Sequence, residues 1–242
     1  MNLIIDVGNT RNKLAVFSEN QLLQKYSCDS DEMPDTLKII RSRYPEIQHC
    51  ILASVGTVPE KIVEVLESEY KVLSLSSETK VPFNNGYGTP ETLGVDRIAL
   101  ASAASVSYPN KNTLVIDAGS CITYDFISEE NIYLGGAISP GIRMRYKAMN
   151  TFTANLPLLE PTLPLIAIGS ETSSSIHSGV LQGVLFEIEG YINLYMKKYP
   201  DLTVILTGGD AHFLRDSLKS DIFANSNFLL EGLNFILDYN KH

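Results

Sequence analysis

Cysteine is scarce in this chain, and its distribution limits what the protein can be. Three cysteines, Cys28, Cys50 and Cys121, are spread over 242 residues. They are odd in number and form no CxxC pair, so the sequence indicates neither a disulfide framework nor a structural zinc site. Cys121 could be a reactive thiol, but a small buried residue is the commoner role at such a position.

Long apolar runs and clusters of basic residues are also lacking. No apolar stretch approaches the length of a membrane span, and Met1 leads straight into an apolar segment with no basic leader. We therefore expect a cytoplasmic protein with no membrane partner. The chain has 28 acidic and 19 basic residues and a formal net charge of −9. Such a surface repels a phosphate backbone, so we expect no nucleic-acid partner.

The first eighteen residues contain a strand, a polar turn and a second strand. Leu3 to Ile5 and Leu14 to Phe17 are apolar runs, and Asp6-Val7-Gly8-Asn9-Thr10 between them has turn chemistry. An acid, a glycine that lets the backbone approach a ligand, and polar donors make a cradle for an anion that also carries a metal. Nucleotide phosphates with magnesium fit this description. An ordinary hairpin with a polar turn would show the same pattern.

A second copy of this pattern favours the phosphate interpretation. Residues 114–126 repeat the apolar strand, the acid and the glycine, with Asp117 and Gly119 each 111 residues after Asp6 and Gly8. A repeat at nearly half the chain length predicts two duplicated halves. We expect domains at 1–110 and 111–242, each with a mixed sheet covered by helices, and a cleft between them.

Three further stretches carry candidate functional residues. The loop 81–89 is rich in structure-breaking residues. Gly94-Val95-Asp96-Arg97 is predicted to lie inside a long helix over 91–107, where the glycine clears space for a ligand; a surface ion pair is the alternative. The helix from about Thr172 to Tyr199 has apolar residues on more than one face, as an interface helix does.

Taken together, these motifs resemble one family. The chain is similar to type III pantothenate kinases, which belong to the superfamily of acetate and sugar kinases, heat-shock chaperones and actin. The matching stretches are residues 6–13, residues 94–97, Asp117-Ala118-Gly119 with Thr123, and Thr207-Gly208-Gly209-Asp210. The resemblance implies two duplicated ribonuclease H-like, actin-like ATPase domains. It also implies ATP-dependent phosphorylation of pantothenate to 4′-phosphopantothenate, the first step towards coenzyme A.

The resemblance also implies a role for individual residues. Asp96 would be the general base, Asp6 would hold the magnesium of MgATP, and Asp117 would bind a monovalent cation, K⁺ or NH₄⁺. Thr172 would contact pantothenate across a homodimer interface. The remaining implied residues bind ATP (Asp6, Val7, Gly8, Asn9, Thr10, Arg11, Asn12, Lys13 and Ser120) or pantothenate (Tyr87, Gly94, Val95, Asp96 and Arg97). Ser120 and Cys121 stand where the family usually has Thr and Ala; the serine keeps a hydroxyl for a phosphate.

Two other functions fit parts of the sequence. A regulatory protein of the same fold would bind nucleotide without phosphorylating a small molecule, but it would not need the Asp96-Arg97 pair. An ATPase activator with an iron–sulfur cluster at a dimer seam would need grouped cysteines, which this chain does not have.

Overall fold

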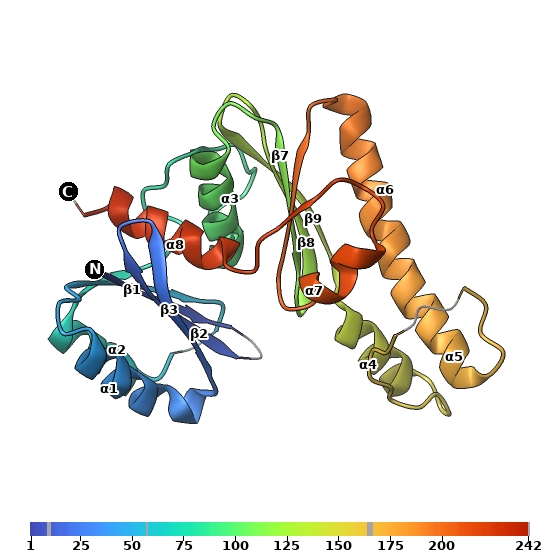
Figure 1. Cartoon of the computed structure of the whole chain (residues 1–242), viewed down its shortest axis with the longest axis horizontal. Coiled ribbons are helices and arrows are strands. Elements are labelled where there is room, and N and C mark those ends of the chain that lie inside the picture. The colour runs from blue at the N-terminus through green and yellow to red at the C-terminus, as the bar shows by residue number, and fades with distance from the viewer. Residues whose placement is uncertain (9–10, 57, 164–166, 242) are drawn as a thin grey trace. The chain divides into compact units, whose positions relative to one another are not determined.

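Two compact units make up the protein in this computed structural model (Figure 1). The structure describes residues 1–8, 11–56, 58–163 and 167–241. The first unit contains Met1–Pro109, Glu130–Leu134 and Asn227–His242, and the second contains Asn110–Glu129 and Gly135–Ser226. None of the helices within these described ranges is long and apolar enough to cross a membrane.

The first unit is built on a five-stranded mixed sheet with the order β3-β2-β1-β4-β5. Its first three strands pair antiparallel, and β1, β4 and β5 run parallel. Alternation along β1 directs Leu3 and Ile5 to one face of the sheet and Ile4 and Asp6 to the other. The strands are β1 (Asn2–Val7), β2 (Asn12–Ser18), β3 (Gln21–Cys28), β4 (His49–Ser54) and β5 (Lys71–Ser74).

Helices cover both faces of this sheet. Leu3 and Ile5 pack with apolar residues of α1 (Met33–Arg43) and α2 (Glu60–Glu69). On the other face, α3 (Val95–Ser107) packs against α8 (Phe228–Tyr239), and both contact strands of the sheet. Short elements complete the unit: η1 (Ser30–Glu32), β6 (Asn84–Asn85), which pairs with the start of β9, and η2 (Pro90–Thr92).

The second sheet has six strands in the order β6-β9-β8-β7-β10-β11, and the five strands after β6 repeat the strand pattern of the first sheet. A large apolar cluster on one face joins the sheet to α4 and α6. The strands are β7 (Thr113–Ala118), β8 (Cys121–Ile127), β9 (Ile132–Pro140), β10 (Thr203–Thr207) and β11 (Phe223–Ala224). The helices are α4 (Ile142–Phe152), α5 (Thr172–His177), the π-helical turn η3 (Ser178–Gln182), α6 (Gly183–Lys198), α7 (Ala211–Leu214) and η4 (Arg215–Ser217).

The matching strand orders confirm the duplicated mixed α/β halves that the repeat predicts. In each half an antiparallel hairpin carries the acid at the end of its first strand, and two parallel strands follow on the other side. The compact units nevertheless divide the chain differently from the halves 1–110 and 111–242. The last helix, α8, packs on α3 and the first sheet because its buried apolar face, including Leu230 and Leu233, needs a partner there.

The predicted helix over 91–107 is wrong at its beginning. Residues 90–92 form a separate 3₁₀ turn, and Gly94 is the N-cap of α3, with a non-helical backbone (φ −58°, ψ 138°). The pattern of apolar residues alone does not reveal this break. Asp96 and Arg97 therefore lie in the first turn of the helix, where backbone N–H groups are exposed, and not in its middle.

Candidate active site

Asp6 and Lys13 face each other across the first hairpin. They are directly paired in the β1–β2 register, and the Lys13 Nζ lies 3.8 Å from the Asp6 Oδ2. Asp6 is only 8% exposed. Burial raises the pKa of its carboxyl above the ordinary value, Lys13 lowers it, and the nearby charge of Asp96 raises it. The site therefore holds two acids and one lysine within electrostatic range of one another.

Asp96 reaches this region from the first turn of α3. Its Oδ1 accepts a hydrogen bond of 2.8 Å from the backbone N–H of Arg97. A carboxylate at a helix N-terminus is stabilised by the helix dipole. A Cβ at Gly94 would lie 2.4 Å from the Asp96 Oδ1, so a larger residue at this position would displace the Asp96 carboxylate. Val95, between them, is the first residue of α3.

Arg97 is held in an aromatic setting beside the same helix turn. Its side chain is only 5% exposed, and its guanidinium carbon lies 5.6 Å from the ring centre of Tyr87 and 5.9 Å from that of Tyr133. Cation–π contacts of this kind fix the plane of a guanidinium. Tyr87 is placed by the pairing of β6 with β9 and by a hydrogen bond from its own N–H to the Asn85 Oδ1 at 3.0 Å.

The rest of the first turn has other contacts. The Arg11 guanidinium donates to the Ser27 backbone oxygen at 3.3 Å, and its Nε lies 3.8 Å from Asp29. Asn12 is buried, and its amide donates to the Ser30 Oγ at 3.4 Å. Val7 is half-buried at the end of β1. Gly8 ends the described part before the turn, and Asn9 and Thr10 lie outside the described residues.

The second hairpin presents a different set of groups. Asp117 is the last residue but one of β7, and the register places Thr123 of β8 opposite it on one side and Thr207 of β10 on the other. The Thr123 hydroxyl donates to the Asp125 Oδ2 at 2.8 Å, so its lone pairs remain available to an electropositive group. Gly208, with a φ of +97°, has no room for a side chain because a Cβ would lie 2.4 Å from the Asp117 Oδ1.

Ser120 is exposed at the tip of the second turn. Its backbone oxygen accepts a hydrogen bond of 3.1 Å from the N–H of Gly141. On the other side of the turn, the N–H of Asp210 donates to the backbone oxygen of Ala118 at 2.9 Å. Three segments of the second unit therefore meet here: the β7–β8 turn, the corner between β9 and α4, and the turn after β10.

Thr172 also lies in the second unit. It is the exposed first residue of α5, directly after the N-cap Glu171. The predicted residues thus fall into two groups. The first unit brings Asp6, Lys13, Asp96, Arg97 and Tyr87 to one region of its sheet, and the second unit holds Asp117, Ser120 and Thr172.

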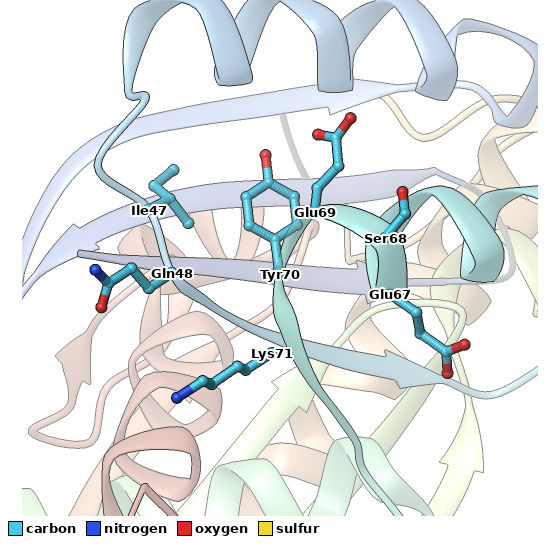
Figure 2. A pocket seen from close by; sticks show the side chains of 7 residues that line it. All are labelled: Ile47, Gln48, Glu67, Ser68, Glu69, Tyr70 and Lys71. Atoms are coloured by element: carbon cyan, nitrogen blue, oxygen red, sulfur yellow. The ribbon is translucent and has the colours of Figure 1, made fainter.

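A pocket of about 420 Å³ lies in the first unit but contains none of these residues (Figure 2). Its lining comes from the start of β4 and β5 and the end of α2, at the amino ends of the parallel strands. Asp6 lies at the opposite, carboxyl edge, where open α/β sheets bind their ligands. The carboxylates of Glu67 and Glu69 point apart in Figure 2, so they do not converge on one ligand.

Comparison with known proteins identifies the family. The model of the type III pantothenate kinase family matches residues 2–194. The chain belongs to this family. It is 50% identical over 241 residues to the type III pantothenate kinase of Christiangramia forsetii, covering 100% of this chain and 99% of that one. The enzyme of the same name from Flavobacterium johnsoniae is 46% identical, with 99% and 98% of the two chains covered.

Solved structures support the fold of this type III pantothenate kinase. A putative Baf family transcriptional activator from Campylobacter jejuni is 25% identical, with a TM-score of 0.64 and 98% of both chains covered. A glucokinase from an Antarctic psychrotroph has a TM-score of 0.51 at 12% identity and covers 99% of both chains. The second likeness shows the fold alone, which is that of the actin-like ATPases and sugar kinases.

Sequence reasoning missed one residue of the candidate site in the first unit. Tyr133 is fully buried and forms one side of the aromatic setting around Arg97, with its ring centre 6.0 Å from that of Tyr87. In the sequence it is one of several apolar residues in the stretch 132–138 and carries no functional signal. The pairing of β6 with β9, which places it there, has no local sequence signal.

Proposed function

We propose that this chain transfers the γ-phosphoryl group of ATP to the primary hydroxyl of pantothenate. The observation that carries this proposal is the grouping of Asp96, Arg97 and Tyr87 with the acid and lysine of the first turn. Phosphoryl transfer needs a base for the attacking hydroxyl, positive charge on the phosphates and a rigid hold on the acceptor. The first unit supplies one candidate for each of these tasks.

Each of these residues would have a distinct role. Asp96 would accept the proton of the pantothenate hydroxyl. Arg97 would pair with the carboxylate of pantothenate, which its planar guanidinium matches. Tyr87, whose ring lies beside the Arg97 guanidinium, would contact the bound pantothenate. Lys13 and the backbone N–H groups of the first turn would neutralise the charge on the transferred phosphoryl group.

Asp6 fits a role in holding the magnesium of MgATP. It is an acid at the end of a strand, largely buried, with its pKa raised mainly by burial. A divalent cation would offset that burial cost and let the carboxylate stay ionised. When bound, Mg²⁺ would supply positive charge that stabilises the transferred phosphoryl group. Lys13 at 3.8 Å would share this task with the metal.

Asp117 fits a monovalent cation for a related reason. A carboxylate beside bound phosphates is repulsive unless a cation lies between them. Threonine hydroxyls flank Asp117 in the register, and that of Thr123 has its proton committed to Asp125. A carboxylate and hydroxyl oxygens are hard ligands of the kind that K⁺ binds. The Ser120 hydroxyl at the tip of this turn would contact ATP.

We further propose a homodimer that forms through α6. Its outward face carries a stripe of glycines and exposed apolar residues: Gly183, Phe186, Gly190 and Leu194. Phe186 is 71% and Leu194 61% exposed, and a Cβ added at either glycine would meet no atom within 4 Å. A second copy of the same helix would bury this face. Thr172, exposed at the start of α5, would then contact the pantothenate bound to the partner.

The cytoplasm is the compartment we propose for this reaction. The proposed reaction uses ATP, which the cytoplasm supplies. The free thiols of Cys28 and Cys50 also suit a reducing compartment. We also propose that residues 1–110 and 111–242 are the two copies of the duplication. Their shared strand order supports this division, although α8 of the second copy packs on the first unit.

A coupled assay of ATP consumption, with and without pantothenate, tests the proposed activity. Pantothenate-dependent turnover should appear in potassium buffer and fall when sodium replaces potassium. The D96N variant should bind ATP as the wild type does, and its turnover should fall by about a hundredfold or more, the usual scale for loss of a general base. Unchanged turnover in D96N removes Asp96 from this role, and ATP binding without pantothenate-dependent turnover favours the regulatory protein.

Light scattering coupled to size-exclusion chromatography tests the dimer. Phe186→Glu should shift the mass from that of two chains to that of one, because a charge would be buried in the seam. Ile39→Glu is the matched control, since Ile39 is a similarly exposed apolar residue on α1. A wild-type mass of one chain, or the same loss of dimer in both variants, excludes the α6 seam.

A further inference from the structure

Glu187 lies at the centre of a polar network that none of the proposed roles uses. Its side chain extends from α6 and is 23% exposed. The Tyr124 hydroxyl donates to its Oε1 at 2.9 Å, and the Ser139 hydroxyl donates to its Oε2 at 3.0 Å. Arg145 forms an ion pair with the same Oε2. Both carboxylate oxygens are therefore engaged, by residues from β8, β9 and α4.

Arg145 extends this network to the corner between β9 and α4. Its Nε donates to the backbone oxygen of Pro140 at 2.9 Å, and its NH2 group donates to the Ser139 Oγ at 2.9 Å. Arg145 and Glu187 thus hold the same serine hydroxyl from two helices. The position of residues 139–141 is determined by side chains and not only by strand pairing.

This corner supports the second phosphate turn directly. The N–H of Gly141 donates to the Ser120 backbone oxygen at 3.1 Å. A Cβ at Gly141 would lie 2.1 Å from the Gly119 oxygen, so the two backbones are in close contact. Any shift of the corner towards the turn must therefore move Gly119 and Ser120.

The electrostatics of the network keep Glu187 ionised. Burial raises the pKa of its carboxyl, but hydrogen bonds from Arg145, Ser139 and Tyr124 lower it by more, and the net shift is downward. The ring of Tyr191 stacks on Tyr124 at 4.1 Å between centres and holds the phenol in place. A neutral apolar side chain at 187 would leave Arg145 and two hydroxyls without their shared acceptor.

We propose that Glu187 is a positioning residue that sets the second phosphate turn for nucleotide binding. It acts through Ser139 and Arg145 on the 139–141 corner, and the corner acts on Gly119 and Ser120. The inference rests on the proposed function only in that the second turn contacts ATP. Glu187 itself touches neither substrate.

The expected result is a selective loss of nucleotide affinity. In Glu187→Ala the KM for ATP should rise about tenfold, while the KM for pantothenate should stay within about twofold of the wild-type value. Glu187→Gln should lie between the two proteins, since an amide oxygen can still accept from one or two of the donors. A merely structural role would lower the unfolding temperature and leave the two KM values alike.

Glu189 gives a matched control on the same helix. Its carboxylate accepts hydrogen bonds from the backbone N–H and the hydroxyl of Ser220 and from the backbone N–H of Lys219. Both residues lie after η4, and neither belongs to the 139–141 corner. Glu189→Ala should lose stability in the same way, but its KM for ATP should not change. An equal rise of that KM in both variants overturns the proposal, as does an unchanged KM in Glu187→Ala.

Two additions keep the test decisive. Ser139→Ala removes only the hydroxyl that Glu187 and Arg145 share, so it should fold and show a smaller rise of the KM for ATP in the same direction. Titration calorimetry with a non-hydrolysable ATP analogue measures nucleotide binding without turnover. Wild-type protein that binds the analogue but does not phosphorylate pantothenate rejects the proposed function, and the Glu187 variants then still test the positioning role through the dissociation constant.

Discussion

The two phosphate turns have the same backbone pattern but balance their acids differently. In the first unit the register places a lysine opposite Asp6. In the second unit the register places Thr123 opposite Asp117. Asp6 therefore faces the positive charge of a lysine side chain. Asp117 faces the Thr123 hydroxyl, whose proton is donated to Asp125 and whose oxygen is left as an acceptor. Under the proposed function, Lys13 would be the permanent positive charge at the first turn, and an exchangeable cation would take that place at the second turn.

The two turns also differ in the segments that surround them. The face of the first sheet that carries Asp6 receives α3, which brings Asp96 and Arg97 to the turn. The second turn is instead contacted by the 139–141 corner and by the Gly208 turn, so closely that neither Gly141 nor Gly208 has room for a side chain. Under the proposed function, the first turn would therefore carry the chemistry and the second would bind the nucleotide. This difference predicts unequal consequences for matched substitutions.

The largest effect is expected at Lys13. Lys13→Met removes the fixed positive charge of the first turn, and kcat should fall by a hundredfold or more because phosphoryl transfer depends on that charge. Additional potassium should not restore turnover. Lys38→Met is the control, since Lys38 is an exposed lysine of the same unit that pairs with Asp35. Restoration by potassium would show that the two turns are electrostatically equivalent.

A smaller effect is expected at Asp117. In Asp117→Asn we expect turnover to fall about tenfold and to become insensitive to whether potassium or sodium is present, because the negative charge that calls for a cation is gone. A second readout needs no turnover: potassium should raise the unfolding temperature of the wild type more than sodium does, and this difference should vanish in the variant. A variant that keeps the potassium response places the cation elsewhere.

At Asp6 we expect a substitution to raise the stability of the folded protein while it removes activity. Burial raises its pKa in the folded state above the ordinary 3.8, so the folded chain binds this proton more tightly than the unfolded chain does. Stability from this group is therefore lost as the pH rises from about 4 through the folded pKa. Asp6→Asn should unfold a few degrees higher than the wild type at pH 7 while losing activity. Thermal melts between pH 4 and 7 measure this, and an unchanged or lower midpoint at pH 7 would contradict it.

Much of this comparison could be predicted from the sequence, because the turns are local. The strand, acid and glycine pattern of residues 3–8 recurs at 114–119, and it was sufficient to predict two mixed sheets. The GVDR motif also gave Asp96 and Arg97 as candidates, although not their place at the helix start. A glycine at the N-cap and a glycine inside the helix look alike in a single sequence.

Other features depend on contacts between distant parts of the chain. Tyr133 meets Arg97 only because β6 pairs with β9, and Glu187 meets Ser139 only because α6 packs beside the β9 corner. The packing of α8 on α3 is likewise a matter of tertiary contacts, made where Gly232 comes so close to Ala99 that a Cβ would overlap its oxygen. No periodicity or motif in a single sequence encodes these pairings.

The smallest effect is expected at Arg11, which belongs to the same motif as Lys13. Its guanidinium contacts Ser27 and Asp29 of the neighbouring segment, and its side chain is about half exposed. Surface contacts of this kind contribute less than about 1 kcal/mol. Arg11→Ala should therefore change kcat and the KM for ATP by no more than about twofold, as steady-state kinetics beside Lys13→Met would show. A loss comparable to that of Lys13→Met would mean that Arg11 leaves Ser27 when ATP binds and that the first turn uses two fixed cations, which would make the contrast with the second turn sharper still.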